Sequence, residues 1–84
     1  MAHVKVFFKV PCPYCVNAKR LLTEKKVNFE EIDLTEKPEE FDRLKNETGY
    51  RTVPMIFIDG KLIGGYSDLR ALEDEGRLDS VLGL

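Results

Sequence analysis

The sequence predicts an α/β domain over residues 1–84, in which a four-stranded mixed sheet is flanked by helices in the order β-α-β-α-β-β-α. Three observations predict it. Four short segments carry the alternating or continuous apolar residues of strands, helical apolar spacing occurs between the first three, and Asp59-Gly60, a strong hairpin signal, joins the last two. Because 84 residues are near the lower limit for one hydrophobic core, a single domain is expected.

The first strand and the first helix lie on either side of a pair of cysteines. Val4–Phe8 is rich in β-branched and aromatic residues, which is typical of a strand. A helix is predicted over residues 13–26, because proline is favoured just inside a helix start, and Cys12 then becomes its N-cap. The face of this helix that points inward is expected to carry Val16, Leu21, Leu22 and Val27, with Ala18 between them.

A second strand is predicted over residues 28–34, where apolar residues alternate with charged ones. Thr35 is suited to cap a helix over residues 37–48, and Gly49 is suited to end it. The inward-facing residues of that helix are expected to be Phe41 and Leu44.

The third and fourth strands are predicted over residues 55–58 and 61–63. Gly64-Gly65 should end the hairpin, and Ser67 or Asp68 should cap a last helix, followed by a final turn near Leu78, Val81 and Leu82. The first two strands are expected to be parallel with a right-handed crossover, with strands one and three at the centre of the sheet.

Composition excludes several classes of protein. With 43% hydrophobic and 33% charged residues, the chain is too apolar for a disordered protein and too polar for a membrane protein. No signal-peptide core follows Met1, so a cytoplasmic location without a membrane partner is expected. A net charge of −2 argues against nucleic acid as a partner. Residues 1–26 nevertheless carry six basic residues against one acidic residue, which favours anionic partners near the cysteines or is simply a solvated basic face.

Cys12-Pro13-Tyr14-Cys15 is the segment that carries the chemistry. Two cysteines are few for a disulfide-stapled secreted protein, and a bridge across three residues closes too small a loop to stabilise a fold well. The pair is therefore expected to be redox-active or metal-binding. Zinc usually takes four protein ligands, and the single histidine, His3, lies far away in the sequence, so a metal would have to be shared across a dimer.

Cys12 is the expected nucleophile of the pair. A thiol reacts as its thiolate, and at a helix N-cap the dipole and the unpaired N–H groups lower the thiol pKa from about 8.5 to within roughly 3.5–7.5. Lys9, three residues earlier, adds positive charge. Cys15, one turn further along the helix, is placed to resolve a mixed disulfide on Cys12. Pro13 stiffens the turn and Tyr14 offers an aromatic wall.

Two later segments are candidates for binding. Arg51-Thr52-Val53-Pro54 precedes the third strand and is either a strand-entry turn or a cis Val53–Pro54 bond that leaves the Val53 backbone free to pair with a substrate. The segment from Gly64 to Asp68 is either a turn with an ordinary N-cap or a helix N-terminus that binds a carboxylate or an amine.

In order and spacing, these three segments resemble the glutaredoxins of the dithiol class, and the resemblance covers almost the whole chain. It implies a thioredoxin fold, a cis Pro54, and glutathione as reducing co-substrate. Tyr66 is a departure, because many dithiol glutaredoxins have a small or polar residue at that position.

The resemblance also implies roles for individual residues. The catalytic pair would be Cys12 and Cys15. Glutathione would pair with the Val53 backbone, set its γ-glutamyl end on Ser67 and Asp68, and direct its glycine carboxylate to Lys9 and Arg51. The remaining groove residues would be Tyr14, Thr52, Pro54 and Gly65.

The implied activity is reduction of protein disulfides and of glutathione mixed disulfides, including deglutathionylation, by a monomer without a tightly bound cofactor. Its partners would be glutathione and disulfide-containing or glutathionylated proteins. Two alternatives stay open: a redoxin that takes electrons from thioredoxin reductase, against which Lys9 and Asp68 argue, and a dimer that bridges a [2Fe-2S] cluster, which Pro13 disfavours.

Overall fold

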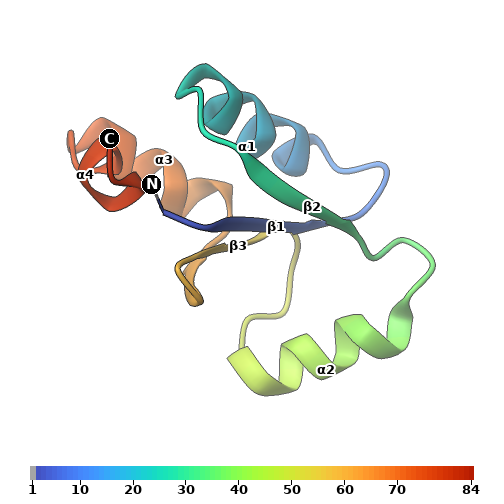
Figure 1. Ribbon diagram of the computed structural model, residues 1–84. Coiled ribbons are helices and arrows are strands. Elements are labelled where there is room, and N and C mark those ends of the chain that lie inside the picture. Colours follow the sequence, from blue (N-terminus) through green and yellow to red (C-terminus); the bar gives the residue numbers. More distant parts are fainter. Residues whose placement is uncertain (1) are drawn as a thin grey trace.

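A four-stranded mixed sheet in the order β2-β1-β3-β4 forms the centre of the computed structural model, which describes residues 2–84 (Figure 1). The strands are β1 (Val4–Phe8), β2 (Phe29–Asp33), β3 (Met55–Ile58) and β4 (Lys61–Gly64). β1 pairs with β2 in parallel and with β3 in antiparallel orientation, and β3 and β4 form the hairpin. The predicted strands, their directions and the central position of β1 and β3 are confirmed.

Helices cover both faces of this sheet. α1 (Pro13–Glu24), α3 (Tyr66–Asp74) and α4 (Leu78–Leu82) lie on one face, and α2 (Pro38–Thr48) lies alone on the other (Figure 1). This arrangement is the thioredoxin fold that the family resemblance implied. Within the part of the chain that the structure describes, no helix is both long and apolar enough to cross a membrane.

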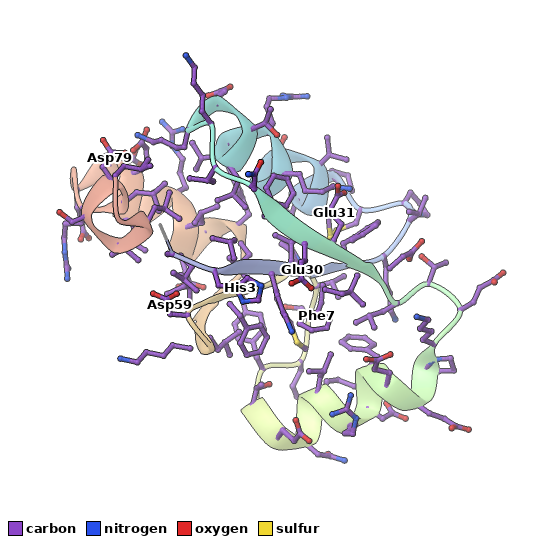
Figure 2. The ribbon with its side chains drawn as sticks, in the orientation of Figure 1. His3, Phe7, Glu30, Glu31, Asp59 and Asp79 are labelled. Atoms are coloured by element: carbon purple, nitrogen blue, oxygen red, sulfur yellow. A yellow bond between two sulfur atoms is a disulfide. The ribbon has the colours of Figure 1, made fainter. Side chains whose placement is uncertain are left out.

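Strand alternation divides the core between the two faces. Val4 and Val6 of β1 are buried on the side of α1, α3 and α4, whereas Phe7 points to the α2 side (Figure 2). The α2 side is built on Leu34, Phe41, Leu44 and Met55. Successive side chains of a strand point to opposite faces, so one strand can supply both clusters.

The inward face of α1 differs from the prediction. The buried residues of α1 are Cys15, Ala18, Leu21 and Leu22, whereas Val16 is 49% exposed. The helix is rotated so that Cys15, and not the residue after it, enters the core. Cysteine is among the most often buried residue types, so it suits this core position.

The predicted start of α2 is also wrong in one respect. Lys37 is the N-cap, no side chain caps the helix there, and the hydroxyl of Thr35 bonds elsewhere. Pro38 takes the first helical position, where a missing N–H does no harm. The end is as predicted: Gly49 has a φ of 76°, the left-handed conformation that glycine adopts without strain.

The β3–β4 hairpin and the start of α3 complete the sheet edge next to the cysteines. Asp59 and Gly60 have φ values of 53° and 79°, as the tight turn predicted for Asp-Gly requires. The N-cap of α3 is Gly65, so the prediction that Ser67 or Asp68 caps it is wrong by two or three residues. Asp68 instead reaches back from the first turn, and its Oδ2 accepts the Gly65 N–H at 3.0 Å.

Candidate redox site

A disulfide joins Cys12 and Cys15 at the start of α1, with their Cα atoms 5.2 Å apart. The two sulfur-bearing residues differ in exposure: Cys15 is 1% exposed, whereas Cys12 is half-buried. A disulfide of this kind offers one sulfur to an incoming thiol and shields the other. The geometry therefore separates an accessible cysteine from a protected one.

Cys12 occupies the N-cap, as the sequence predicted. Its backbone is extended, with φ −157° and ψ 98°, and its Sγ accepts the backbone N–H of Cys15 at 3.2 Å. Pro13 follows as the first helical residue, and the first turn contains no acidic side chain. The sulfur thus faces the positive end of the helix without a competing carboxylate on the same turn, which is the setting that stabilises a thiolate.

An apolar hollow of about 320 Å³ lies beside the disulfide, and Lys9, Cys12, Cys15 and Val16 are among the residues that line it. The ammonium of Lys9 lies 4.0 Å from the centroid of the Phe41 ring. Lys9 therefore lies in the surroundings of the cysteines, but its charge rests on an aromatic face of α2.

A second hollow, of about 250 Å³, contains most of the residues that the resemblance assigned to glutathione. We call it the tyrosine groove; its lining is Tyr14, Tyr50, Thr52, Val53, Pro54, Gly65, Tyr66 and Ser67. The Val53–Pro54 bond in its wall is cis, as expected. Tyr50 and Tyr66 were not predicted as lining residues.

Close packing between two segments shapes the floor of the tyrosine groove. A Cβ placed on Gly65 would lie 2.5 Å from the hydroxyl oxygen of Tyr50 and 3.5 Å from the carbonyl oxygen of Pro54. Any larger residue at position 65 would therefore require the Tyr50 side chain to shift. The double glycine of the sequence was the signal for this approach, but its partner Tyr50 could not be read from it.

Two tyrosines stack across the groove. The rings of Tyr14, on α1, and Tyr66, on α3, have centroids 6.3 Å apart and planes inclined by 28°. Tyr66 also packs against the core cluster beneath α1 and α3, whereas Tyr14 is 62% exposed. The more exposed ring therefore rests on the one that packs against the core.

Three of the predicted binding residues lie outside the tyrosine groove. Lys9 belongs to the apolar hollow, and Arg51 is exposed. Asp68 is exposed, and one of its carboxylate oxygens is engaged with Gly65. None of these three charged residues lines the groove.

The surroundings offer no evident metal centre. Among residues 2–84, no group of three or more His, Cys, Asp or Glu side chains is arranged to hold a metal ion. His3 lies at the opposite end of β1 from Cys12 and its Nε2 is 2.6 Å from Glu30 Oε1 (Figure 2). His3 is thus far from the redox chemistry, as its place in the sequence suggested.

The comparisons with known proteins agree with this geometry. The family model described as "Glutaredoxin" matches residues 4–63, which is most of the chain. Glutaredoxin 3 of Escherichia coli is 43% identical over 82 residues, covering 98% of this chain and 99% of the relative. A glutaredoxin of Pseudomonas aeruginosa is 44% identical over 82 residues, with 98% of both chains covered.

Solved structures give the same result. A crystal structure of wheat glutaredoxin matches with a TM-score of 0.89 and 45% identity, over 96% of this chain and 78% of that one. A buckwheat glutaredoxin–glutathione complex matches with a TM-score of 0.89 and 33% identity, over 98% of this chain and 77% of that one. Fold, paired cysteines and relatives together identify a redox-active disulfide in a thiol-disulfide oxidoreductase.

Proposed function

The chain belongs to the glutaredoxin family, and on that premise we propose that it reduces protein disulfides and glutathione mixed disulfides with electrons from glutathione. The observation that carries the proposal is the position of the half-buried Cys12 sulfur, at a helix N-terminus and two residues before Tyr14 of the tyrosine groove. A peptide thiol bound in that groove can approach Cys12 from the surface, where Cys15 is buried and does not stand in the way.

Glutathione is proposed to lie along the tyrosine groove in an extended conformation. Its cysteinyl backbone pairs with Val53, between Thr52 and the ring of Tyr14. The groove's size supports a small peptide: its volume of about 250 Å³ accommodates the central part of a tripeptide while the ends reach outward. The solved buckwheat complex with glutathione supports the choice of ligand.

The two charged ends of glutathione are proposed to extend beyond the groove and to reach charged residues outside its lining. The γ-glutamyl carboxylate meets the first turn of α3 at Ser67, beside Gly65, because the first backbone N–H groups of a helix have no partner within the helix. Asp68 binds the γ-glutamyl ammonium, because its carboxylate is exposed and keeps free lone pairs after it accepts the Gly65 N–H. Lys9 and Arg51 are the cations proposed for the glycine carboxylate.

The reaction at Cys12 is a pair of thiol-disulfide exchanges. The Cys12 thiolate attacks the glutathione sulfur of a mixed disulfide; the new bond joins Cys12 to glutathione, and the substrate leaves as a thiolate that solvent protonates. A second glutathione thiolate then attacks the bound glutathione sulfur, which forms glutathione disulfide and releases Cys12. In the net reaction one glutathione thiol is consumed and one protein thiol is released, and the glutathione that the protein carried leaves as half of the glutathione disulfide.

Cys15 is proposed to act only when the substrate is a protein disulfide. Cys12 first forms a mixed disulfide with the protein, and the thiolate of Cys15 attacks Cys12, which releases the reduced protein and leaves the Cys12–Cys15 bond. Burial of Cys15 at 1% exposure suits this role, because external thiols cannot reach it directly. Glutathione then reduces the internal disulfide.

The setting of the reaction follows from its reductant. Exchange driven by glutathione requires a reducing compartment, so we propose a cytoplasmic location and glutathionylated or disulfide-containing proteins as partners. The working form is proposed to be a monomer whose only co-substrate is glutathione, with no tightly bound cofactor.

A coupled assay tests the proposed function. Reduction of a glutathionylated substrate is followed as NADPH consumption, in one mixture with glutathione and glutathione reductase and in another with thioredoxin reductase. Turnover in the glutathione mixture is expected, with little in the other. Turnover that occurs only with thioredoxin reductase would overturn the proposal.

A further inference from the structure

The side chain of Thr35 bonds the loop that leads into Cys12. The backbone N–H of Val10 donates to Thr35 Oγ1 at 2.9 Å. Val10 lies two residues before Cys12, whereas Thr35 belongs to the connection between β2 and α2. A hydroxyl from a distant part of the chain therefore holds the backbone from which the reactive cysteine projects.

This hydrogen bond fixes the backbone of the loop, whose other contact is the Lys9 ammonium on the Phe41 ring. Across residues 2–84, it is the sole hydrogen bond found between residues 9–11 and the rest of the chain. The Val10 side chain is 60% exposed and Pro11 is also exposed, so packing of these two residues holds the backbone before Cys12 only weakly. The last hydrogen bond before the loop is made by Phe8, the final residue of β1, whose carbonyl accepts the Leu34 N–H at 2.8 Å.

Asp33 fixes the direction of the Thr35 hydroxyl. The Oδ1 atom of Asp33 accepts both the Thr35 hydroxyl and the Thr35 backbone N–H, the latter at 2.9 Å. A hydroxyl has one hydrogen, so donation to Asp33 turns a lone pair toward Val10, and the carboxylate charge strengthens that lone pair as an acceptor. The hydrogen bond from the Thr35 side chain is also the largest cause that lowers the pKa of Asp33.

We propose that Thr35 is a positioning residue for thiol-disulfide exchange at Cys12, acting through the Val10 backbone. This inference rests on the proposed role of Cys12 as the attacking thiol. By holding the loop, Thr35 keeps Cys12 in the extended N-cap conformation in which its sulfur accepts the Cys15 N–H. Without that tie, the sulfur spends less time at the helix N-terminus, and the thiolate loses part of its stabilisation.

The test measures the ionisation of Cys12 in full-length protein that carries Cys15→Ser, so that Cys12 is the only thiol. Thr35→Val removes the hydroxyl at nearly constant shape, and Thr35→Ser restores it. Thr23→Val is the matched control, because Thr23 is an exposed threonine whose hydroxyl bonds the Lys19 carbonyl at 2.8 Å within α1. The rate of alkylation by iodoacetamide is recorded as a function of pH for each variant.

Thr35→Val is expected to move the midpoint of the alkylation profile to higher pH and, at a pH below the parent's midpoint, to lower the rate by about two- to tenfold, the range of one hydrogen bond. Thr35→Ser and Thr23→Val are expected to match the parent. A folded Thr35→Val protein, judged by circular dichroism, with the parent midpoint would overturn the proposal.

Asp33→Asn keeps the inference testable if Thr35→Val does not fold. It removes the charge that orients the Thr35 hydroxyl, so a smaller shift of the midpoint in the same direction is expected, and an unchanged midpoint contradicts the proposal. Failure of the proposed function would be distinct: it would appear in the protein with native Thr35, as absent glutathione-dependent turnover or an ordinary cysteine midpoint.

Discussion

The sulfur of Cys12 accepts the backbone N–H of Cys15 at 3.2 Å, so the second cysteine of the pair helps to solvate the first. This relationship places the accessible sulfur at the positive end of α1 while the other sulfur stays within the core. The two cysteines are chemically the same residue, but they thereby take different positions for reaction.

In the reduced protein, Cys12 is expected to ionise well below the pKa of about 8.5 of a free cysteine, because the helix N-terminus stabilises its thiolate. The ultraviolet absorbance of the thiolate, followed as a function of pH, measures this. Cys15→Ser should keep the low transition and Cys12→Ser should lose it. The assignment fails if the low transition survives in Cys12→Ser.

Gly65→Ala tests the packing beneath the tyrosine groove. The added methyl group would lie 2.5 Å from the Tyr50 hydroxyl oxygen, so we expect a loss of about 1–3 kcal/mol in the free energy of unfolding. Chemical denaturation measures it. Adding Tyr50→Phe removes the clashing oxygen and should recover much of the loss; equal stability of the single and double variants would contradict this explanation.

Tyr66→Asn tests the stacked pair of tyrosines. Loss of the ring leaves Tyr14 unsupported, and the KM for a glutathionylated substrate is expected to rise by about two- to tenfold, in keeping with the energy of one aromatic pair. Steady-state kinetics measure the effect. Tyr66→Phe keeps the ring and should behave as the native protein does, so a similar rise in both variants would count against stacking as the cause.

The pH dependence of the β2–α2 connection can be predicted from Asp33. Its pKa lies below the ordinary value of 3.8, first because the Thr35 hydroxyl donates to it and then because the Thr35 N–H does. A carboxyl whose pKa is lowered on folding stabilises the folded state above its unfolded pKa, and that contribution disappears as the pH falls through the folded pKa.

Nuclear magnetic resonance titration of the Asp33 carboxyl measures this shift directly. Thr35→Val should raise the pKa of Asp33 toward its ordinary value, because the first of its two donors is lost. Thr23→Val serves as the control and should leave the pKa of Asp33 unchanged. A pKa of Asp33 that is unaffected by Thr35→Val would show that the hydroxyl does not act on this carboxyl.

Local rules predicted most of the fold, because the residues that decide each element lie next to one another. Asp59-Gly60 dictates its tight turn by conformation alone, and Gly49 ends α2 for the same reason. The same holds for Cys12, whose place at an N-cap follows from Pro13. These features do not depend on contacts from elsewhere in the chain.

The features that the sequence did not predict depend on contacts between distant segments of the chain. Thr35 looked like a helix cap, yet its hydroxyl bonds Val10, 25 residues away in the sequence. Tyr50 enters the tyrosine groove only because α3 packs against the segment before β3, and Val16 is exposed because Cys15 fills the core position. Such partners cannot be read from residue spacing.

The measurement that tests the central claim most directly is deglutathionylation by the two single cysteine variants. A glutathionylated peptide is supplied with glutathione, and the appearance of free peptide is followed by mass spectrometry. We predict that Cys15→Ser retains this activity and that Cys12→Ser abolishes it, because only Cys12 presents an accessible sulfur to the substrate. Activity that persists in Cys12→Ser would contradict the account.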